Sequence, residues 1–499
     1  MHALLLLPLL LPALAPSDPQ GGRSPEEILK EIRSSGSDSP PALFEELAKQ
    51  RSAEALEALI EGLQAVAKPD KVCAGFKAFR HFQGVDGVAD DAARYLAERA
   101  DSKPPKLGLH AVWNLGSLWP AGRDELVELA LDHPTPDGRS FALMHLVEHE
   151  LPLTDKELGR FARSKDDAVR YEVLLASTGR IEDPERRARA IEKGLGSRDA
   201  IERLAAVELL GALEHPGRFE RLAERLGDED PRVRRKALHS LERTRSREAV
   251  ERLIVRLDVA GESERFRLSR TLVRLTGRDL GREPGRWQRW WAAEGATFEV
   301  GALGDGDEAA PPAGPGVNDE GSTRSDFYGL PIHAERLVFA IDASDSMKKA
   351  AKGDDGPSRI EIAKQQLLGA IERLEEPASF DVVHFGASAW SWKGELTPAS
   401  ERNKKAALKH VRYLDLSWGT EVYGALREAF RDPRADTVLL LTDGDPQLSL
   451  MQDRAAVQRI VAQWNRTRHT AIDCLSIGAE RAWLRKLADQ TGGRYKTVD

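Results

Sequence analysis

Five polar side chains follow the ends of predicted elements in the last third of the chain, and their types suit a metal site. Asp342, Ser344 and Ser346 come directly after one apolar run, Thr420 lies in a loop after a long helix, and Asp443 comes directly after a second apolar run. Two carboxylates and three hydroxyls are hard oxygen donors, which suit an octahedral Mg²⁺ or a similar cation. No His or Cys joins them, so zinc is a poor candidate.

The elements that must position these residues alternate between strand and helix from Arg336 onward. Alternation of this kind predicts an α/β doubly wound (Rossmann-like) sheet, in which ligands bind outside the carboxyl ends of the strands. The three polar loops are therefore expected to converge at one edge. The predicted strands are 337–341, 380–385, 388–392, 437–441, 470–477 and 494–498, and the predicted helices are 359–374, 400–413, 421–430, 455–466 and 482–491.

The sequence D-x-S-x-S, followed later by Thr and then by Asp, resembles the metal-ion-dependent adhesion site (MIDAS) of von Willebrand factor A (VWA) domains. The resemblance spans 334–499 and includes the order of strands and helices. It implies that the hydroxyls of Ser344, Ser346 and Thr420 contact the metal, and that Asp342 and Asp443 act directly or through water. It also implies a divalent cation as cofactor, Mg²⁺ first, with Ca²⁺ or Mn²⁺ as alternatives.

The charge of this donor set indicates what it does. Three of the five donors are neutral hydroxyls, so a bound dication stays under-neutralised and keeps an open position. A carboxylate from a protein partner completes the shell through a charge-assisted contact. Two departures add negative charge: Asp345 stands where many relatives have Gly, and Glu421 stands where Asn or Asp is common. They predict weaker attraction for an acidic partner, or a preference for Ca²⁺ or Mn²⁺.

Two enzyme patterns occur in part. The Asp342-Ala-Ser344 loop is superficially similar to the nucleophile loop of haloacid-dehalogenase phosphatases, which need a second Asp where this chain has Ser. His145 to His149 matches H-x-x-E-H, but no third ligand follows, so we interpret both histidines as polar residues on a helix surface. No Walker loop, G-x-S-x-G motif or plausible triad occurs, so an enzyme is not expected.

Residues 25–300 are predicted to be helical throughout and repetitive. Val169, Ile201 and Val233 lie 32 residues apart, each near the start of a helix that opens with an acid or Pro. Each helix pair has one apolar face that it cannot bury alone, so copies stack into a solenoid. The sequence Asp-Pro-x-Val-Arg-x-x-Ala-Leu at 230–238 resembles a HEAT repeat. The alternative is an irregular helical bundle.

The repeats are predicted to end at a Trp-rich helix. A fourth, weaker copy begins near 264–266, and Trp287, Trp290 and Trp291 follow at i, i+3 and i+4. Aromatic side chains on one helix face form either a ligand platform or a packing surface. We interpret these three as packing that seals the open end of the solenoid.

A linker is predicted between the two domains, at 301–333, because this stretch is rich in Gly, Pro, Ala and acids and has no periodicity. Asp305, Asp307 and Glu308 resemble part of a calcium loop but lack the other EF-hand positions. We therefore favour a linker over a calcium site.

The composition fits a globular protein of two or three domains, with 499 residues and a net charge of -8. This mildly acidic balance gives no reason to expect a nucleic-acid partner. The arginine-rich run at 232–236 is interpreted as a solvated, salt-bridged helix face, because acids are interleaved with it. Cys73 and Cys474 are too few and too far apart for a disulfide framework and are predicted to be buried thiols.

The N-terminus predicts export. Residues 1–15 are mostly Leu, Ala and Pro and end in Ala13-Leu14-Ala15, which suits signal-peptidase cleavage, although no Lys or Arg precedes the apolar run. No Cys follows directly, so a lipoprotein anchor is not expected, and no later run is long enough for a membrane span. The expected location is the periplasm or the extracellular space.

The sequence as a whole predicts an exported protein with three parts after the signal peptide at 1–15: a HEAT-like α-solenoid at 25–300, a linker at 301–333 and a VWA domain at 334–499. The predicted function is metal-ion-dependent protein binding or adhesion. Two alternatives stay open. One is a cytoplasmic, chelatase-type subunit that docks onto an AAA+ ATPase, and the other is a scaffold whose metal only orders loops.

Overall fold

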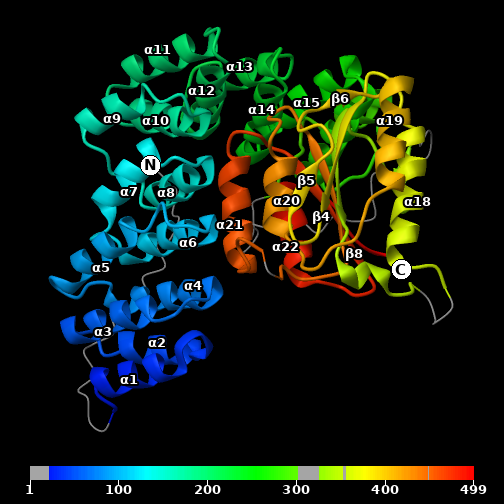
Figure 1. Cartoon of the computed structure of the whole chain (residues 1–499). Coiled ribbons are helices and arrows are strands. Elements are labelled where there is room, and N and C mark those ends of the chain that lie inside the picture. The colour runs from blue at the N-terminus through cyan, green and yellow to red at the C-terminus, as the bar shows by residue number, and fades with distance from the viewer. Residues whose placement is uncertain (1–21, 302–324, 352–355, 448, 499) are drawn as a thin grey trace. The chain divides into compact units, whose positions relative to one another are not determined.

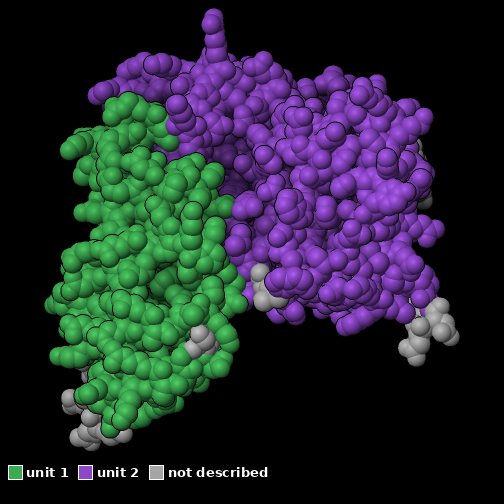
Figure 2. Space-filling model, in the orientation of Figure 1, with its two compact units in different colours: residues 1–164 green, residues 165–499 purple. Residues whose placement is uncertain are grey.

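The computed structural model describes residues 22–301, 325–351, 356–447 and 449–498. The predicted signal peptide and the acidic residues Asp305, Asp307 and Glu308 of the predicted linker lie outside this range. The chain divides into two compact units, residues 1–164 and 165–499 (Figure 2). This division falls inside the helical region, and the domain boundaries drawn from the sequence stay a prediction.

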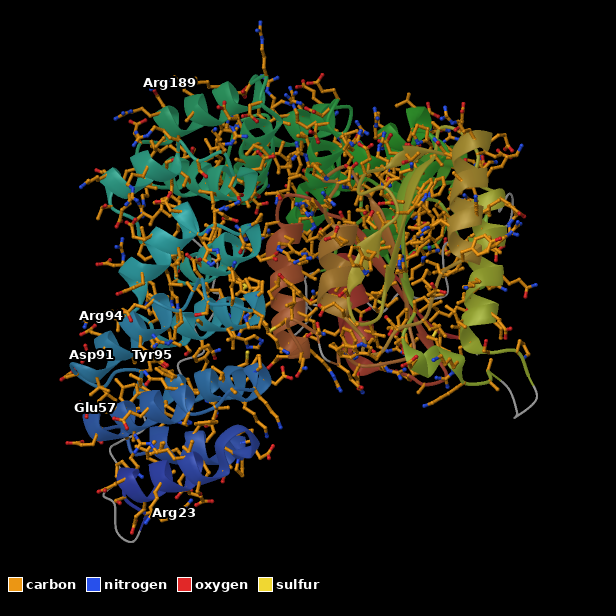
Figure 3. The ribbon with its side chains drawn as sticks, in the orientation of Figure 1. Arg23, Glu57, Asp91, Arg94, Tyr95 and Arg189 are labelled. Atoms are coloured by element: carbon orange, nitrogen blue, oxygen red, sulfur yellow. The ribbon has the colours of Figure 1, made fainter. Side chains whose placement is uncertain are left out.

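The first unit contains only helices over its described residues. Its helices are amphipathic, with charged side chains on the exposed face and apolar side chains on the face that packs against other helices. On α5, Arg94 pairs with Asp91 at 3.0 Å on the surface (Figure 3), while Tyr95 stacks on Phe79 with ring centroids 5.3 Å apart. The α-helices are α1 (Pro25–Ser35), α2 (Pro41–Ala48), α3 (Ala53–Gln64), α4 (Pro69–Ala78), α5 (Val88–Ala97), α6 (Pro105–Leu115), α7 (Arg123–Asp132), α8 (Pro136–Glu148) and α9 (Asp155–Phe161).

The H-x-x-E-H stretch in this unit is a packing element. The His145 ring is buried against Trp113, with centroids 5.5 Å apart, and the His149 ring stacks on Trp119 at 4.0 Å just beyond the end of α8. The interpretation of His145 as a helix-surface residue is therefore wrong. Among the described residues, no group of three or more His, Cys, Asp or Glu side chains is arranged to hold a metal ion.

The second unit begins with four helical hairpins, which confirm the predicted repeats. Asp166, Asp199 and Asp230 cap the first helix of the first three hairpins, and each accepts a hydrogen bond from the backbone N–H two residues later. Consecutive capping residues are 33 and 31 residues apart, whereas the predicted apolar positions repeat every 32 residues. The start of the middle helix is therefore shifted by one residue relative to the apolar repeat. The helices are α10 (Asp167–Gly179), α11 (Pro184–Leu195), α12 (Ala200–Ala212), α13 (Arg218–Arg225), α14 (Pro231–Thr244), α15 (Arg247–Val259), α16 (Glu262–Thr276) and α17 (Pro284–Glu294).

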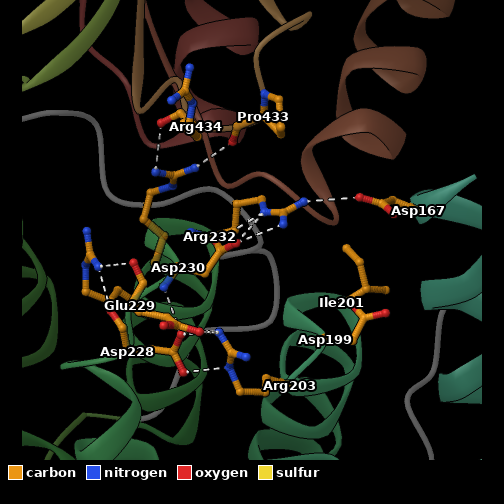
Figure 4. Close-up of polar contacts among 12 residues, drawn as sticks. Asp167, Asp199, Ile201, Arg203, Asp228, Glu229, Asp230, Arg232, Pro433 and Arg434 are labelled. Atoms are coloured by element: carbon orange, nitrogen blue, oxygen red, sulfur yellow. Dashed lines mark hydrogen bonds and ion pairs between the residues drawn. The ribbon is translucent and has the colours of Figure 1, made fainter. Parts of the chain in front are cut away.

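Buried charges join consecutive repeats. The Arg203 side chain on α12 donates two hydrogen bonds to Asp228, at 3.0 and 2.9 Å, in the turn before α14 (Figure 4). Arg235 and Lys236 on α14 are also buried, at 7% and 4% exposure. The solvated face predicted for this run is therefore wrong at these two residues, because α14 packs against α12 on one side and against the sheet domain on another.

The Trp-rich helix packs as predicted. The Trp287 side chain is fully buried, and its Nε1 donates a 2.8 Å hydrogen bond to the Gly281 carbonyl. Trp290 is nearly buried and meets Phe298 edge-on at 5.1 Å, and Trp291 packs against the same cluster. Trp287 and Trp290 therefore belong to the core of the repeats, and the partly buried Trp291 packs against it.

The rest of this unit is the predicted doubly wound sheet. In space the strands follow the order β5-β4-β3-β7-β8-β9, with β6 also paired to β4. β3, β4, β7, β8 and β9 are parallel, and β5 and β6 are antiparallel to β4. The strands are β3 (Arg336–Asp342), β4 (Ser379–Phe385), β5 (Ala389–Ser391), β6 (Thr397–Pro398), β7 (Thr437–Thr442), β8 (Ala471–Ile477) and β9 (Tyr495–Val498).

Helices cover both faces of this sheet, as Figure 1 shows. Leu337, Phe339 and Ile341 of β3 face the core shared with α18 and α19, and the alternate residues face the other side. Because both faces are covered, β3 and β7 are nearly continuous apolar runs. The helices are α18 (Arg359–Glu372), α19 (Glu401–Arg412), α20 (Val422–Ala429), α21 (Arg454–Asn465) and α22 (Ala482–Thr491).

A small hairpin precedes the sheet, inside the stretch predicted as linker. It consists of β1 (Asp326–Phe327) and β2 (Leu330–Pro331), which pair antiparallel. Phe327 is fully buried and packs edge-on against Phe339 of β3 at 5.7 Å. The hairpin thus extends the core of the sheet domain.

Two further predictions concern the state of the two cysteines and the presence of a membrane-spanning helix. Cys73 and Cys474 are free and buried, which confirms the prediction of buried thiols. Within the part of the chain that the structure describes, no helix combines the length and apolarity that crossing a bilayer demands.

Candidate metal site

The strand order places Asp342 and Asp443 beside each other. The chain passes from β3 to its neighbour β4 on one side and later to β7 on the other, so the order reverses between β3 and β7. Asp342 is the last residue of β3, and Asp443 directly follows β7. In open α/β sheets the ligand crevice lies at such a switch point, outside the carboxyl ends of the strands.

Hydrogen bonds join four of the five predicted ligands. The hydroxyls of Ser344 and Ser346 lie 2.9 Å apart, and Ser346 Oγ donates to Asp443 Oδ1 at 2.6 Å. Asp342 Oδ1 accepts from the backbone N–H of Ser344 at 2.9 Å, and its Oδ2 accepts from the Thr442 hydroxyl at 2.6 Å. The oxygens of two loops from distant parts of the chain therefore converge.

Thr420 comes from a third loop at the same edge. Its backbone exchanges two hydrogen bonds with Gln447, at 2.9 and 3.2 Å, in the segment that follows β7. A Cβ atom built on Gly444 would lie 3.6 Å from Thr420 Oγ1, so this hydroxyl lies beside the residue after Asp443. The same loop also pairs with the first one, because Ser417 forms a parallel bridge with Ser344.

Both carboxylates of the site are buried. Asp342 is fully buried, and desolvation raises its pKa to about 6, although the hydrogen bonds from Ser344 and Thr442 oppose the rise. The side chain of Asp443 is also inaccessible to solvent. Buried carboxylates need a counter-charge, and a cation between them supplies one.

Two arginines contact Asp443, and sequence reasoning missed both. Arg359, the first residue of α18, donates from Nη1 to Asp443 Oδ2 at 2.6 Å. Arg481 donates to the main-chain carbonyl of Asp443. No sequence signal joins these residues, because 84 and 38 positions separate them from Asp443. Arg359 neutralises part of the charge of Asp443 and fixes the side chain, leaving Oδ1 toward Ser346.

The two departures from the family pattern each have a local partner. The carboxylate of Asp345 pairs with Lys348 at 2.7 Å. The carboxylate of Glu421 is buried and accepts hydrogen bonds from the backbone of Gly424 and Leu450 and from the Ser449 hydroxyl, at 2.7–2.9 Å. Glu421 therefore caps α20 and ties it to the loop after β7. The charge of Asp345 is thus paired with a cation, and the carboxylate of Glu421 is held by hydrogen bonds.

The donor set fits a hard divalent cation. Its convergent oxygens come from carboxylates and hydroxyls: the two serine hydroxyls lie 2.9 Å apart, and one of them lies 2.6 Å from the Asp443 carboxylate. Oxygens this close together can share one small ion. The set contains no nitrogen or sulfur donor, which favours Mg²⁺, Ca²⁺ or Mn²⁺ over zinc.

Comparison with known proteins agrees with this domain architecture. The family model described as von Willebrand factor type A domain matches residues 335–497, and the model described as HEAT repeats matches residues 188–268. The two matches support the predicted HEAT-like repeats, over part of the helical region, and the predicted VWA domain at the C-terminal end.

Relatives match the C-terminal domain over short spans. Human von Willebrand factor A domain-containing protein 3B is 25% identical over 169 residues, which cover 33% of this chain and 12% of that protein. Inter-alpha-trypsin inhibitor heavy chain H1 of Mesocricetus auratus is 31% identical over 125 residues, covering 23% of this chain and 13% of that protein. The chain therefore spans about an eighth of the length of these relatives.

A von Willebrand factor type A protein from Catenulispora acidiphila is 28% identical, with a TM-score of 0.29, and the match covers 33% of this chain and 39% of that one.

Proposed function

We propose that this protein is a metal-ion-dependent binding protein, not an enzyme. In this proposal one divalent cation, Mg²⁺ first, is held by Asp342, Ser344, Ser346, Thr420 and Asp443. The observation that supports it most directly is the continuous contact from Ser344 through Ser346 to Asp443 at the switch point of the sheet. The cation supplies a Lewis-acidic position that a carboxylate of a protein partner can fill.

The charges around the site support a partner that is acidic. Three of the donors are neutral hydroxyls, and Arg359 already neutralises part of the charge of Asp443. A dication at this place would keep a net positive charge that favours an incoming carboxylate. Asp345 and Glu421 are engaged by Lys348 and by the cap of α20, so neither offers a competing free carboxylate.

The helical repeats add a second surface to the proposal. Stacked hairpins present an extended face, which is a common way to bind proteins. The relatives that match the C-terminal domain include inter-alpha-trypsin inhibitor heavy chains, and the shared von Willebrand factor type A domain supports a general role in protein interaction.

A displacement experiment tests whether a carboxylate reaches the cation. The full chain is loaded with Mn²⁺, and the relaxation of water protons is measured while poly-glutamate is added, with poly-glutamine as the matched neutral control. We expect poly-glutamate to displace metal-bound water and to lower the relaxation rate, and poly-glutamine to leave it unchanged. Saturable Mn²⁺ binding without any response to poly-glutamate would support instead a scaffold whose metal only orders loops.

The proposal also includes export, from the apolar run that ends in Ala13-Leu14-Ala15. N-terminal sequencing of the protein from fractionated source cells tests it. A mature chain that begins at Pro16 in the exported fraction supports export. Retention of Met1 in a cytoplasmic protein would favour the chelatase-type alternative.

A further inference from the structure

A cavity lies within the second unit, at the end of the sheet opposite the metal site. Its volume is about 370 Å³, at the low end of the range for small-molecule sites, which is roughly 300–1,000 Å³. It is lined by α14 and α16 of the helical repeats, by the first residues of β7 and β8, and by the segment before β9. The metal ligands follow the other ends of β3 and β7.

The lining is strongly basic. It contains seven arginines and four acids, which leaves three positive charges in excess, and its three histidines are His239, His333 and His469. Burial lowers the pKa of His239 to about 4 and that of His469 well below its ordinary value, so neither adds charge near neutral pH.

Most of the acids are already engaged by arginines. Glu242 accepts from Arg274, Asp473 accepts from Arg494, and Asp436 pairs with Arg267 at 3.4 Å. The acids therefore offer little charge to the remaining arginines of the cavity.

Three lining arginines have no carboxylate partner among the described residues, namely Arg235, Arg270 and Arg245, the last of which donates to the Gly301 carbonyl. Arg235 donates only to the main-chain carbonyls of Arg468, Arg434 and Pro433, the last two visible in Figure 4, and Arg270 donates to the carbonyl of Gly492. Neither forms an ion pair with any described residue. Burial lowers the pKa of Arg235 to about 9 and that of Arg270 to about 10. A buried guanidinium of this kind is stabilised by an anion.

One more buried polar group lacks a partner at this place. His469 Nε2 accepts or donates no hydrogen bond within the described structure, and its ring lies 5.0 Å from that of His239 across the junction between α14 and the sheet domain. His469 also has a positive φ of 50°, which a non-glycine residue rarely adopts. Unpaired groups and a strained residue are typical of a binding site.

We propose that this cavity binds a small organic oxyanion, a carboxylate or phosphate ester attached to an apolar group. The oxyanion would lie against Arg235 and Arg270, whose N–H groups form the fork geometry that oxyanions require. The apolar part would lie against Leu238, Phe266 and Leu439, which line the same cavity. Such a ligand contacts the helical repeats, through α14 or α16, and also contacts the sheet domain. It therefore stabilises the junction between them.

Calorimetry on the full chain with simple probes tests the proposal. Phenyl phosphate and benzoate represent the two oxyanions, and benzyl alcohol is the uncharged control. The chain is freed of divalent cations with a chelating resin before each titration, so binding at the metal site cannot imitate binding in the cavity. We expect saturable binding of at least one anion and none of benzyl alcohol. The stronger of the two anions identifies the source of the oxyanion.

Variants locate the binding. Arg270→Met should weaken binding by roughly tenfold or more, because it removes one charged donor. Ala334→Phe narrows the same cavity without changing its charge and should weaken binding as well. Arg94→Met, on the exposed face of α5, is the control that removes an arginine elsewhere. Absence of saturable anion binding by the wild-type chain, or equal affinity in wild type, Arg270→Met and Ala334→Phe, would overturn the proposal. Either result leaves the metal-dependent function untouched.

Discussion

Ser346 donates a 2.6 Å hydrogen bond to Asp443, although 97 residues separate them in the chain. The contact joins the loop after β3 to the loop after β7, on the two sides of the point where strand order reverses. A sheet wound in both directions leaves a crevice at that point. This one contact therefore connects the topology of the domain to the metal-dependent binding proposed for it.

Removal of the Glu421 carboxylate should destabilise the sheet domain without affecting the cation. Glu421→Ala takes away a buried acceptor of three hydrogen bonds at the start of α20. We expect the free energy of unfolding to fall by about 1–3 kcal/mol. Urea denaturation measures this loss, and Glu401→Gln, at an exposed ion pair with Lys404, is the matched control with little expected change. A variant with normal stability and altered Mg²⁺ affinity would show that Glu421 belongs to the metal site.

Arg203 should be among the residues on which the helical repeats depend most. Arg203→Ala leaves the buried Asp228 without its bidentate partner, and we expect a loss of about 3 kcal/mol in the free energy of unfolding. The control is Arg189→Ala, on the outer surface (Figure 3) with a side chain that is 68% exposed, where we expect a change within about 0.5 kcal/mol. Similar losses in both variants would mean that the Arg203–Asp228 pair does not join the repeats.

The His239 side chain should make the second unit sensitive to acid. Its pKa is lowered by burial to about 4 in the folded protein, below the ordinary value of 6.5. The unfolded chain therefore binds the proton first, so stability falls as the pH decreases from about 6.5 towards 4. Charged and titratable groups act on this ring as well, namely Lys236, Glu242, Glu208, Arg243 and His469.

Substitution isolates this contribution. His239→Gln keeps a polar side chain of similar size and does not titrate, so its melting temperature should depend less steeply on pH between 7 and 5 than that of the wild type. Thermal unfolding at several pH values measures the two slopes. Equal slopes would assign the acid sensitivity to other groups.

The sequence predicts most of the sheet domain because local signals and tertiary structure agree there. β3 and β7 are buried on both faces and are therefore continuous apolar runs, and Ser358 and Glu361 form a capping box at the start of α18. The β1–β2 hairpin was not predicted, because its two-residue strands lie in a polar, Gly-containing stretch and gain their stability from the burial of Phe327.

The metal site and the cavity show the same difference between what local sequence signals predict and what only tertiary contacts reveal. The five candidate ligands stand in loops whose order and residue types a sequence displays directly. Arg359 and the cap formed by Glu421 were missed because their partners, Asp443 and Leu450, come from elsewhere in the chain. The buried Arg235 was predicted as a solvated residue, since nothing local shows that the sheet domain packs against α14.

The most direct test of the proposed metal site is calorimetric titration of Mg²⁺ into the full chain, beside the Ser344→Ala, Ser346→Ala double variant, with folding of both checked by circular dichroism. We expect saturable binding of one cation by the wild type and loss of that binding in the double variant. A folded wild-type chain that binds no Mg²⁺, Ca²⁺ or Mn²⁺, or a double variant that binds with unchanged affinity, would contradict it.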